Sequence, residues 1–272
     1  MRVLAINDIS CVGRCSLAAT LPIISACGVE CNVLPTALLS THTGGFKGYT
    51  FCDLTNEMQG ILQHWKTLGL KFDYIYSGYL GSTEQIDMVL EIKKHFLKEG
   101  GFLVVDPVMG DNGKLYAGFT EEYVGKMRIL CKAADYILPN ETEACYLTNT
   151  PYPLTKATAP IALQKLTTLC AKPIITGVTN EDKISVYFIE ENGELAVYSN
   201  ENVEGFFCGA GDVFASAFVG CLAKGKTQAE AITLSSNFTA ASIRRSAIEV
   251  PDRRYGLNFE AEIFSFLKNV NG

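Results

Sequence analysis

Short apolar segments of strand length alternate with amphipathic helical segments along most of the chain. In the helical segments apolar residues recur every three to four positions, as Met58, Ile61 and Trp65 do. Strands are predicted at residues 2–7, 31–34, 74–77, 102–106, 136–138 and 173–176. Helices are predicted at residues 17–26, 56–68, 84–98, 120–132, 141–147, 161–170, 213–223, 228–243 and 260–269. This order predicts an α/β fold with a doubly wound, mainly parallel sheet and helices on both faces.

One pair of predicted strands departs from the alternation. Residues 184–189 and 195–198 follow each other across Glu191-Asn192-Gly193, a sequence typical of a turn. We therefore expect one β-hairpin near residues 184–198. Because no internal repeat, low-complexity tract or linker interrupts the pattern, we expect a single domain over residues 1–272.

Composition limits the partners and the compartment. A formal net charge of −6 argues against nucleic acid or an anionic membrane as a standing partner. We find no signal peptide and no stretch of eighteen apolar residues, and the ten cysteines lack the paired spacing of a zinc site. These features predict a cytoplasmic protein with reduced thiols and no membrane span. Any phosphate ligand would have to be held by backbone dipoles and a metal ion.

A glycine-rich turn before a predicted helix is the most informative local motif. Gly209-Ala210-Gly211-Asp212 leads directly into the apolar helical pattern of residues 213–223. Glycines let the backbone approach a ligand closely, and the free N–H groups of a helix start attract an anion. Asp212 could then remove a proton from an attacking hydroxyl, which predicts phosphoryl transfer to an alcohol. The alternative is a tight turn in which Asp212 only caps the helix.

Polar side chains also follow other predicted strands, where sheets of this class bind ligands. Asp106, Asp111 and Glu143 are hard oxygen donors suited to Mg²⁺, directly or through water. Asn140 could offer its amide to a phosphate oxygen or to a metal-bound water. Asp106 and Asn140 could instead do no more than cap helices.

A second polar group lies nearer the amino terminus. Asp8 and Ser10 follow the first predicted strand, and His42 and Thr43 lie in a Ser/Thr/Gly-rich loop after the second. Together with the ring of Tyr79 they suit a small polar heterocycle. A histidine in such a loop more often forms hydrogen bonds within the loop than takes part in chemistry, so we expect no direct chemical role for His42.

Six short motifs occur in a fixed order. They are Asp8-x-Ser10-x-x-Gly13, Ser40-Thr41-His42-Thr43-Gly44, Ser77-Gly78-Tyr79, Asp106-Pro107-Val108-Met109-Gly110, Pro139-Asn140-x-x-Glu143 and Gly209-x-Gly211-Asp212. Together they resemble the ribokinase-like superfamily and, within it, the vitamin B6 (pyridoxal/pyridoxamine) kinase branch. The resemblance covers about residues 2–245 and implies a kinase acting on the 5′-hydroxymethyl group of pyridoxal, pyridoxamine or pyridoxine.

The resemblance also implies roles for individual residues. Asp212 would be the base, and the backbone of Gly209, Ala210 and Gly211 would form the anion hole. Ala210 stands where the family commonly has Thr, so a hydroxyl contact to phosphate would be absent while the backbone N–H remains.

The cofactors implied are ATP and Mg²⁺, with a monovalent cation left open. Asn140 and Glu143 would organise Mg²⁺ and the ATP phosphates, with Asp106 near the same ion. Thr176 and Gly177 match a nucleotide-binding position.

The remaining positions match the substrate side of the family site. Asp8 or Ser10, Thr43 and Tyr79 correspond to positions around the pyridine ring. The family resemblance, and nothing in the periodicity, further implies a homodimer.

Three other functions stay open from the sequence. A kinase of hydroxymethylpyrimidine, a thiamin precursor, would act on a ring of similar size and polarity. A non-catalytic protein that binds ATP or a B6 vitamer would need no base at position 212. A sugar kinase would need a strand-rich lid early in the chain, and we predict none between Leu34 and Phe72.

Overall fold

The computed structural model describes all 272 residues and contains a central sheet of nine strands. Along the sheet the order is β11-β10-β9-β8-β5-β4-β1-β2-β3. The strands are β1 (Arg2–Ser10), β2 (Glu30–Leu39), β3 (Phe51–Asp53), β4 (Phe72–Ser77), β5 (Leu97–Val105), β8 (Tyr136–Ile137), β9 (Lys172–Asn180), β10 (Lys183–Ile189) and β11 (Leu195–Glu201). Two short strands, β6 (Gly110–Asp111) and β7 (Lys114–Leu115), form a separate hairpin.

Nine α-helices cover the two faces of the sheet. They are α1 (Ser16–Ala26), α2 (Thr55–Thr67), α3 (Thr83–Phe96), α4 (Glu121–Ala133), α5 (Glu141–Thr148), α6 (Ala159–Leu166), α7 (Ala210–Ala223), α8 (Gln228–Glu249) and α9 (Ile263–Asn271). Two short 3₁₀ helices, η1 (Arg253–Tyr255) and η2 (Glu260–Glu262), lie between α8 and α9. None of these helices combines the length and the apolarity needed to cross a membrane.

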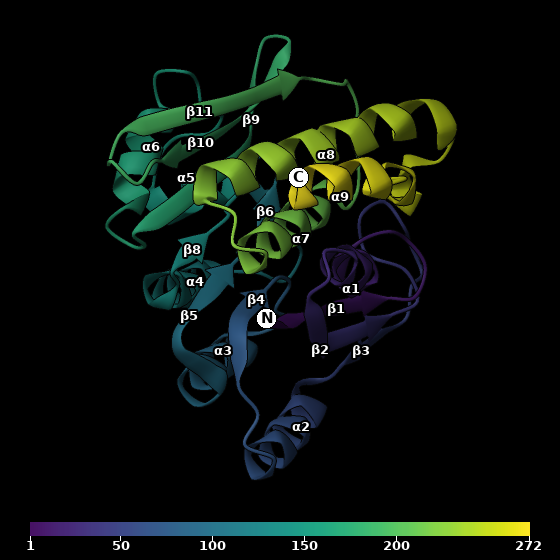
Figure 1. The fold of residues 1–272 in the computed structure, drawn as a ribbon, viewed down its shortest axis with the longest axis vertical. Coiled ribbons are helices and arrows are strands. Elements are labelled where there is room, and N and C mark those ends of the chain that lie inside the picture. The colour runs from purple at the N-terminus through teal and green to yellow at the C-terminus, as the bar shows by residue number, and fades with distance from the viewer.

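Alternate residues of the strands fill two separate apolar cores, because successive side chains of a strand point to opposite faces. In β1, Leu4 and Ile6 join the core under α2–α6, whereas Val3 and Ala5 join the core under α1 and α7–α9. Figure 1 shows α7, α8 and α9 lying together on one face, with β9–β11 at one end of the sheet and β1–β3 at the other. Helices on both faces of a mainly parallel sheet confirm the predicted fold class.

The sheet carries more antiparallel pairing than the sequence predicts. The expected hairpin is present as β10 and β11, but β10 is also antiparallel to β9, and β3 is antiparallel to β2. Strand β3 has only three residues, all exposed, so no alternation of apolar and polar residues marks it in the sequence. The β6–β7 hairpin has two residues in each strand and escapes prediction for the same reason.

Several predicted boundaries are also wrong in ways that affect the site. Strand β1 continues to Ser10, so Asp8 and Ser10 lie inside it instead of after it. The pairing of β1 with β2 shifts register between Asn7 and Ile9, and this bulge lets the polar end of β1 remain in the sheet. Strand β9 continues to Asn180, which places Thr176 and Gly177 inside a strand as well.

The parallel strands β1, β4, β5 and β8 have their carboxyl ends side by side at one edge of the sheet. Backbone hydrogen bonds join Gly78 N to Ile6 O at 2.8 Å, Asp106 N to Ser77 O at 2.9 Å and Leu138 N to Val105 O at 2.9 Å. The residues that follow β1, β4, β5 and β8 are therefore neighbours in space although they are far apart in sequence. The fold places the predicted functional residues along this edge.

Candidate active site

A cavity of about 450 Å³ opens at the carboxyl edge of the sheet, a volume in the range of small-molecule sites. Its walls come from the strand ends, the turn before α7 and one side of α8. The lining includes ten of the residues predicted from the sequence: Asp106, Asp111, Asn140, Glu143, Thr176, Gly177, Gly209, Ala210, Gly211 and Asp212. The structure thus brings the predicted nucleotide and catalytic groups into one cavity.

The charge of this cavity is one-sided. Five of its lining residues are acidic (Asp106, Asp111, Glu143, Glu201 and Asp212), and none is Lys, Arg or His. An anionic ligand in this cavity therefore has only backbone N–H groups, side-chain amides and hydroxyls as donors, unless a cation enters with it.

The amino terminus of α7 opens into the cavity. Gly209 precedes the helix in the left-handed conformation, with φ of 78°, and a Cβ at this position would lie 2.3 Å from the carbonyl oxygen of Arg14. Only glycine combines this backbone with this close approach. At Gly211 a Cβ would meet no atom within 4 Å, so the first turn of α7 faces open space. The first N–H groups of a helix have no partner within it and can bind an anion there.

Asp212 lies in the first turn of α7, half buried. Its Oδ1 accepts a hydrogen bond of 3.2 Å from Nδ2 of Asn7 at the end of β1. Burial raises the pKa of Asp212 to about 6, and the charge of Asp8 adds to the rise; hydrogen bonds from the backbone N–H of Ser16 and from Asn7 oppose it. A carboxyl group with this pKa is ionised at neutral pH and still basic enough to accept a proton.

Asp106 and Glu143 lie deeper in the same cavity. Burial, together with the negative charges of Glu143 and Asp212, raises the pKa of Asp106 well above its usual range. Burial also raises the pKa of Glu143 to about 7, although hydrogen bonds from three backbone N–H groups favour its ionised form and oppose the rise. Because each charge disfavours the others, a cation placed among these carboxylates would stabilise all of them.

Backbone donors hold Glu143 in place. Its Oε1 accepts from Met109 N at 2.8 Å and its Oε2 from Asn140 N at 2.9 Å, while Asn140 Oδ1 accepts from Glu143 N at 2.9 Å. This reciprocal pair is a capping box at the start of α5. Asn140 Nδ2 also donates to the carbonyl of Gly110 at 2.8 Å. Asn140 does cap a helix, as the simpler alternative held, and it also lines the cavity.

A β-bulge turns Thr176 and Gly177 toward the cavity. In the pairing of β9 with β10, Tyr187 is opposite Ile175 and Ser185 is opposite Val178, so Thr176 and Gly177 together face one residue. Gly177 has a φ of 73°, which suits such a bulge. Thr176 N also donates to Pro139 O at 2.9 Å, which fixes the bulge beside Asn140.

The predicted substrate residues Asp8, Ser10, His42, Thr43 and Tyr79 lie outside the lining of the 450 Å³ cavity, and hydrogen bonds connect Asp8 and Tyr79 to Asp212. Asn7 makes the connection, because its Oδ1 accepts from Tyr79 N at 2.8 Å and from Asp8 N at 3.0 Å. Ser10 Oγ donates to Asp8 Oδ2 at 3.1 Å. Burial raises the pKa of Asp8, and hydroxyl donors oppose the rise. Tyr79 stacks on Phe119 with ring centroids 6.0 Å apart.

His42 has a structural position in the loop that follows β2. Its Nδ1 accepts from Gly44 N at 3.1 Å, and its Nε2 lies 2.5 Å from the carbonyl oxygen of Arg254. With Nδ1 accepting, Nε2 must carry the proton, so both ring nitrogens are engaged. These contacts agree with the expectation that His42 takes no direct chemical part. The neighbouring Thr43 is exposed.

One segment near the carboxyl terminus braces two loops of the site. The guanidinium of Arg254 stacks on Phe46 at 4.9 Å in the loop that carries His42. The guanidinium of Arg253 stacks on Phe207 at 4.7 Å in the turn before α7, and its Nη1 donates to Glu204 O at 3.1 Å. Consecutive residues of η1 therefore contact the loop that carries His42 and the turn before α7.

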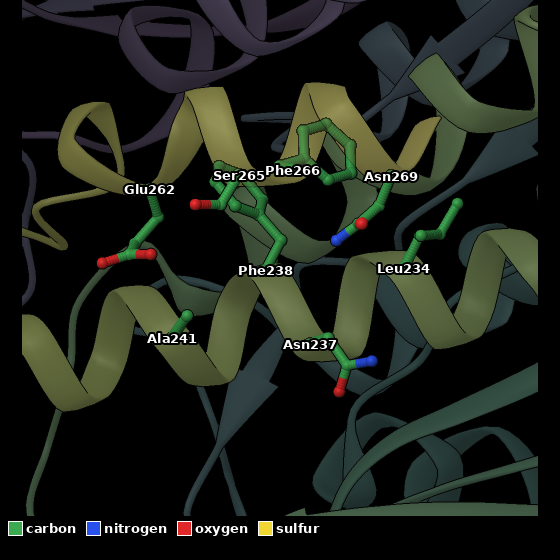
Figure 2. A pocket seen from close by; sticks show the side chains of 8 residues that line it. All are labelled: Leu234, Asn237, Phe238, Ala241, Glu262, Ser265, Phe266 and Asn269. Atoms are coloured by element: carbon green, nitrogen blue, oxygen red, sulfur yellow. The ribbon is translucent and has the colours of Figure 1, made fainter. Parts of the chain in front are cut away.

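A second, smaller cavity of about 210 Å³ lies between α8 and α9, away from the strand ends (Figure 2). The rings of Phe238 and Phe266 stack at 4.4 Å in its wall. Its one ionisable lining residue is Glu262, which pairs with Arg245 at 2.5 Å. With no free charged group, this cavity offers no chemistry comparable to that at the sheet edge.

Comparison with known proteins identifies the family. The sequence model of the family described as phosphomethylpyrimidine kinase matches residues 15–256. The chain belongs to this family. Within the ribokinase-like superfamily it falls in the pyridoxal kinase branch, and it is an ATP-dependent kinase.

Solved structures and curated relatives support that placement. A Bacteroides thetaiotaomicron protein assigned as a phosphomethylpyrimidine kinase and crystallised with pyridoxal is 36% identical, with a TM-score of 0.91 over 100% of this chain and 96% of that one. Pyridoxal kinase from Lactobacillus plantarum is 32% identical, with a TM-score of 0.91 over 98% and 96% of the two chains. Pyridoxal kinase PdxY of Actinobacillus pleuropneumoniae is 28% identical over 240 residues, which are 81% of this chain and 80% of that protein.

Sequence reasoning on this kinase missed Asn7 and Ser16, the two residues that donate hydrogen bonds to Asp212. Asn7 gives a weak signal, since it is a polar residue at the end of an apolar strand. The role of Ser16 gives none, because it uses a backbone N–H in an unusual conformation with φ of 51°.

The turn before α7 allows a matched test of backbone geometry. We expect Gly209→Ala to lower the free energy of unfolding by roughly 1–3 kcal/mol, because alanine must adopt a left-handed φ against the carbonyl of Arg14. Gly211→Ala should leave stability unchanged or slightly raised, since its Cβ meets nothing. Chemical denaturation of both variants checks this; equal stability of the two would contradict the geometry.

Proposed function

We propose that this kinase transfers the γ-phosphoryl group of ATP to the 5′-hydroxymethyl group of pyridoxal, pyridoxamine or pyridoxine. One observation carries the proposal: the carboxylate of Asp212 lies at the amino terminus of α7 and is joined through Asn7 to Asp8 and Tyr79. Asp212 thus stands between a place for phosphate and a place for a small ring. The pyridoxal kinases among the relatives and the pyridoxal-bound Bacteroides structure support this substrate class.

The nucleotide would occupy the 450 Å³ cavity, with its terminal phosphate at the start of α7. Backbone N–H groups of Gly209, Ala210 and Gly211 would form the anion hole. The absence of a Thr at position 210 does not remove an N–H group from this turn. Thr176 and Gly177 would contact the nucleotide from the bulge in β9, which faces the same cavity.

The donor set fits Mg²⁺. Asp106 is the better placed carboxylate, because both oxygens of Glu143 accept backbone hydrogen bonds and both oxygens of Asp111 accept hydrogen bonds from Asn112. Asp111 would add a second ligand, directly or through water. No three acidic, cysteine or histidine side chains converge into a complete metal site. Mg²⁺ commonly binds through one or two carboxylates plus water and substrate phosphates, which agrees with this arrangement. When bound, the ion would neutralise charge on the phosphates among five carboxylates.

In the proposed reaction the substrate hydroxyl oxygen attacks the γ-phosphorus. The new O–P bond forms as the bond from phosphorus to the β-γ bridging oxygen breaks and releases ADP. Asp212 accepts the hydroxyl proton, and the helix start stabilises the charge on the transferring group. Asn140 and Glu143 would keep the turn that carries Asp106 and Asp111 in position, through the hydrogen bonds described above.

The substrate class can be tested directly. We expect ADP release with pyridoxal, pyridoxamine and pyridoxine when each is supplied with ATP and Mg²⁺, and none when EDTA removes the metal. The matched comparison is hydroxymethylpyrimidine under the same conditions. Faster turnover of the pyrimidine would replace the vitamer assignment, and saturable binding without ADP release would indicate a binding protein.

The role of Asp212 has its own test. Asp212→Asn keeps the shape of the side chain but removes the base, so kcat should fall by roughly 10²–10⁴-fold. ATP affinity should change little, because the backbone N–H groups and the carboxylates Asp106 and Asp111 remain. Steady-state kinetics and a nucleotide titration on the same preparation separate the two effects. Undiminished turnover would remove Asp212 from the mechanism.

The pH dependence follows from the raised pKa of Asp212. A base must be unprotonated, so activity is present above a pKa of about 6 and is lost as the pH falls through it. We expect kcat/KM for pyridoxal to decline about tenfold per pH unit below that point. Measurement from pH 5 to 8, with circular dichroism at each pH to confirm folding, checks this. A flat profile in folded protein would rule out Asp212 as the titrating base.

A further inference from the structure

The side-chain amide of Asn7 contacts the proposed base and, at the same time, the backbone N–H groups of Asp8 and Tyr79 on the proposed substrate side. We infer that Asn7 is a positioning residue that holds the carboxylate of Asp212 in its reactive orientation relative to the vitamer. The inference rests on the proposed function. It assigns a role to a residue that does not itself touch the reacting atoms.

The orientation of the amide is determined by its surroundings. Two backbone N–H groups, those of Tyr79 and Asp8, point at one end of the Asn7 side chain at 2.8 and 3.0 Å. An N–H group can only donate, so the oxygen of the amide must face them. The NH₂ group is then directed at Oδ1 of Asp212, 3.2 Å away. The donor is aligned before any ligand binds.

The fold reserves the space that this amide occupies. Asn7 is only 1% exposed, at the bulge near the end of β1. Gly78, the residue directly after β4, faces the Asn7 side chain. A Cβ at position 78 would lie 2.4 Å from Nδ2 of Asn7. A side chain at position 78 would therefore push the amide away from Asp212. A buried amide with all its polar atoms engaged is a rigid element.

No cationic side chain orients Asp212. The titratable groups near it are Asp8 on β1, Cys15 before α1, Tyr76 on β4, Asp106 after β5, Tyr116 after β7 and Cys208 before α7. All of these are acidic or neutral, and none can donate a charge-assisted bond from a positive group. Two neutral donors, Asn7 and the backbone N–H of Ser16, are what fix the carboxylate.

The same amide also sets the distance between base and ring. Its oxygen holds the backbone of Tyr79 and Asp8, and its nitrogen holds Asp212, a residue 205 positions away in the sequence. Displacement of the amide should therefore lower kcat and leave ATP binding unchanged, because a misplaced base slows proton transfer without altering the nucleotide cavity.

Asn7→Asp separates the two ends of the amide. The variant keeps an oxygen for the N–H groups of Tyr79 and Asp8 but replaces the NH₂ group beside Asp212 with a second carboxyl group. While that carboxyl group is protonated it can still donate. When it ionises, two negative charges face each other and the base is pushed aside.

We expect the pH profile of kcat for Asn7→Asp to gain an alkaline limb that the wild type lacks. Along this limb kcat should fall about tenfold as the second carboxyl group ionises. The KM for ATP should stay within about twofold. A pH profile of kcat for wild type and variant provides the measurement. A wild-type profile in the variant would overturn the inference and leave Asn7 a purely structural acceptor.

The chain offers a matched control in the hairpin between β10 and β11. Asn192 also accepts from a backbone N–H, that of Glu194 at 2.9 Å, and donates to the Glu194 carboxylate at 3.0 Å, but it is exposed and far from the site. Asn192→Asp should reproduce the wild-type profile. An alkaline limb in this control would show that the effect of Asn7→Asp is not local, and the inference would fail.

A second variant covers the case in which Asn7→Asp does not fold. Gly78→Ala leaves Asn7 unchanged but displaces its amide, so kcat should fall and the acid limb should move to higher pH at constant ATP affinity. If folded Gly78→Ala has the kcat of the wild type and an acid limb at the same pH, the inference is overturned. If Asp212→Asn abolishes turnover while these variants behave as wild type, the positioning role fails and the proposed base survives.

Discussion

The concentration of buried carboxylates at one edge of the sheet, with no basic side chain in the cavity, is the constraint on which the site depends. Buried charges are costly unless hydrogen bonds or counter-ions satisfy them. Here the donors are backbone N–H groups and amides: Met109 and Asn140 for Glu143, and Ser16 and Asn7 for Asp212. The loops at the strand ends therefore have conformations set by the acids that they must satisfy. In the proposed function, the same excess of negative charge would make nucleotide binding depend on the accompanying cation.

Much of the fold and ten of the thirty residues that line the cavity could be predicted from the sequence, because both follow from local patterns. Alternating strand and helix periodicity specifies a doubly wound sheet, and such sheets gather the residues after their strands at one edge. This rule predicts Asp106 and Asn140, and the glycine-rich turn before a predicted helix predicts Asp212. These residues converge in one cavity because of the order of the strands in the sheet. Local periodicity does not specify that order, which can be predicted only from the general rules of α/β topology.

The rest depends on register and on contacts between distant segments. The bulge at Thr176 and Gly177 arises from how β9 pairs with β10, and its one local signal is the glycine, which from the sequence alone indicates the end of the strand. The contact of Asn7 with Asp212 spans 205 positions and requires the whole sheet to be assembled. The positive φ of Ser16 is likewise imposed by the surrounding chain. Functional residues that act through backbone groups or through another side chain leave little trace in composition or spacing.

The two arginines of η1 connect a segment near the carboxyl terminus to two loops of the site. Arg253 packs on Phe207 and Arg254 on Phe46, so one short 3₁₀ helix contacts both the turn before α7 and the loop that carries His42. This segment, although distant in sequence from the strand ends, therefore packs on a loop from each side of the site.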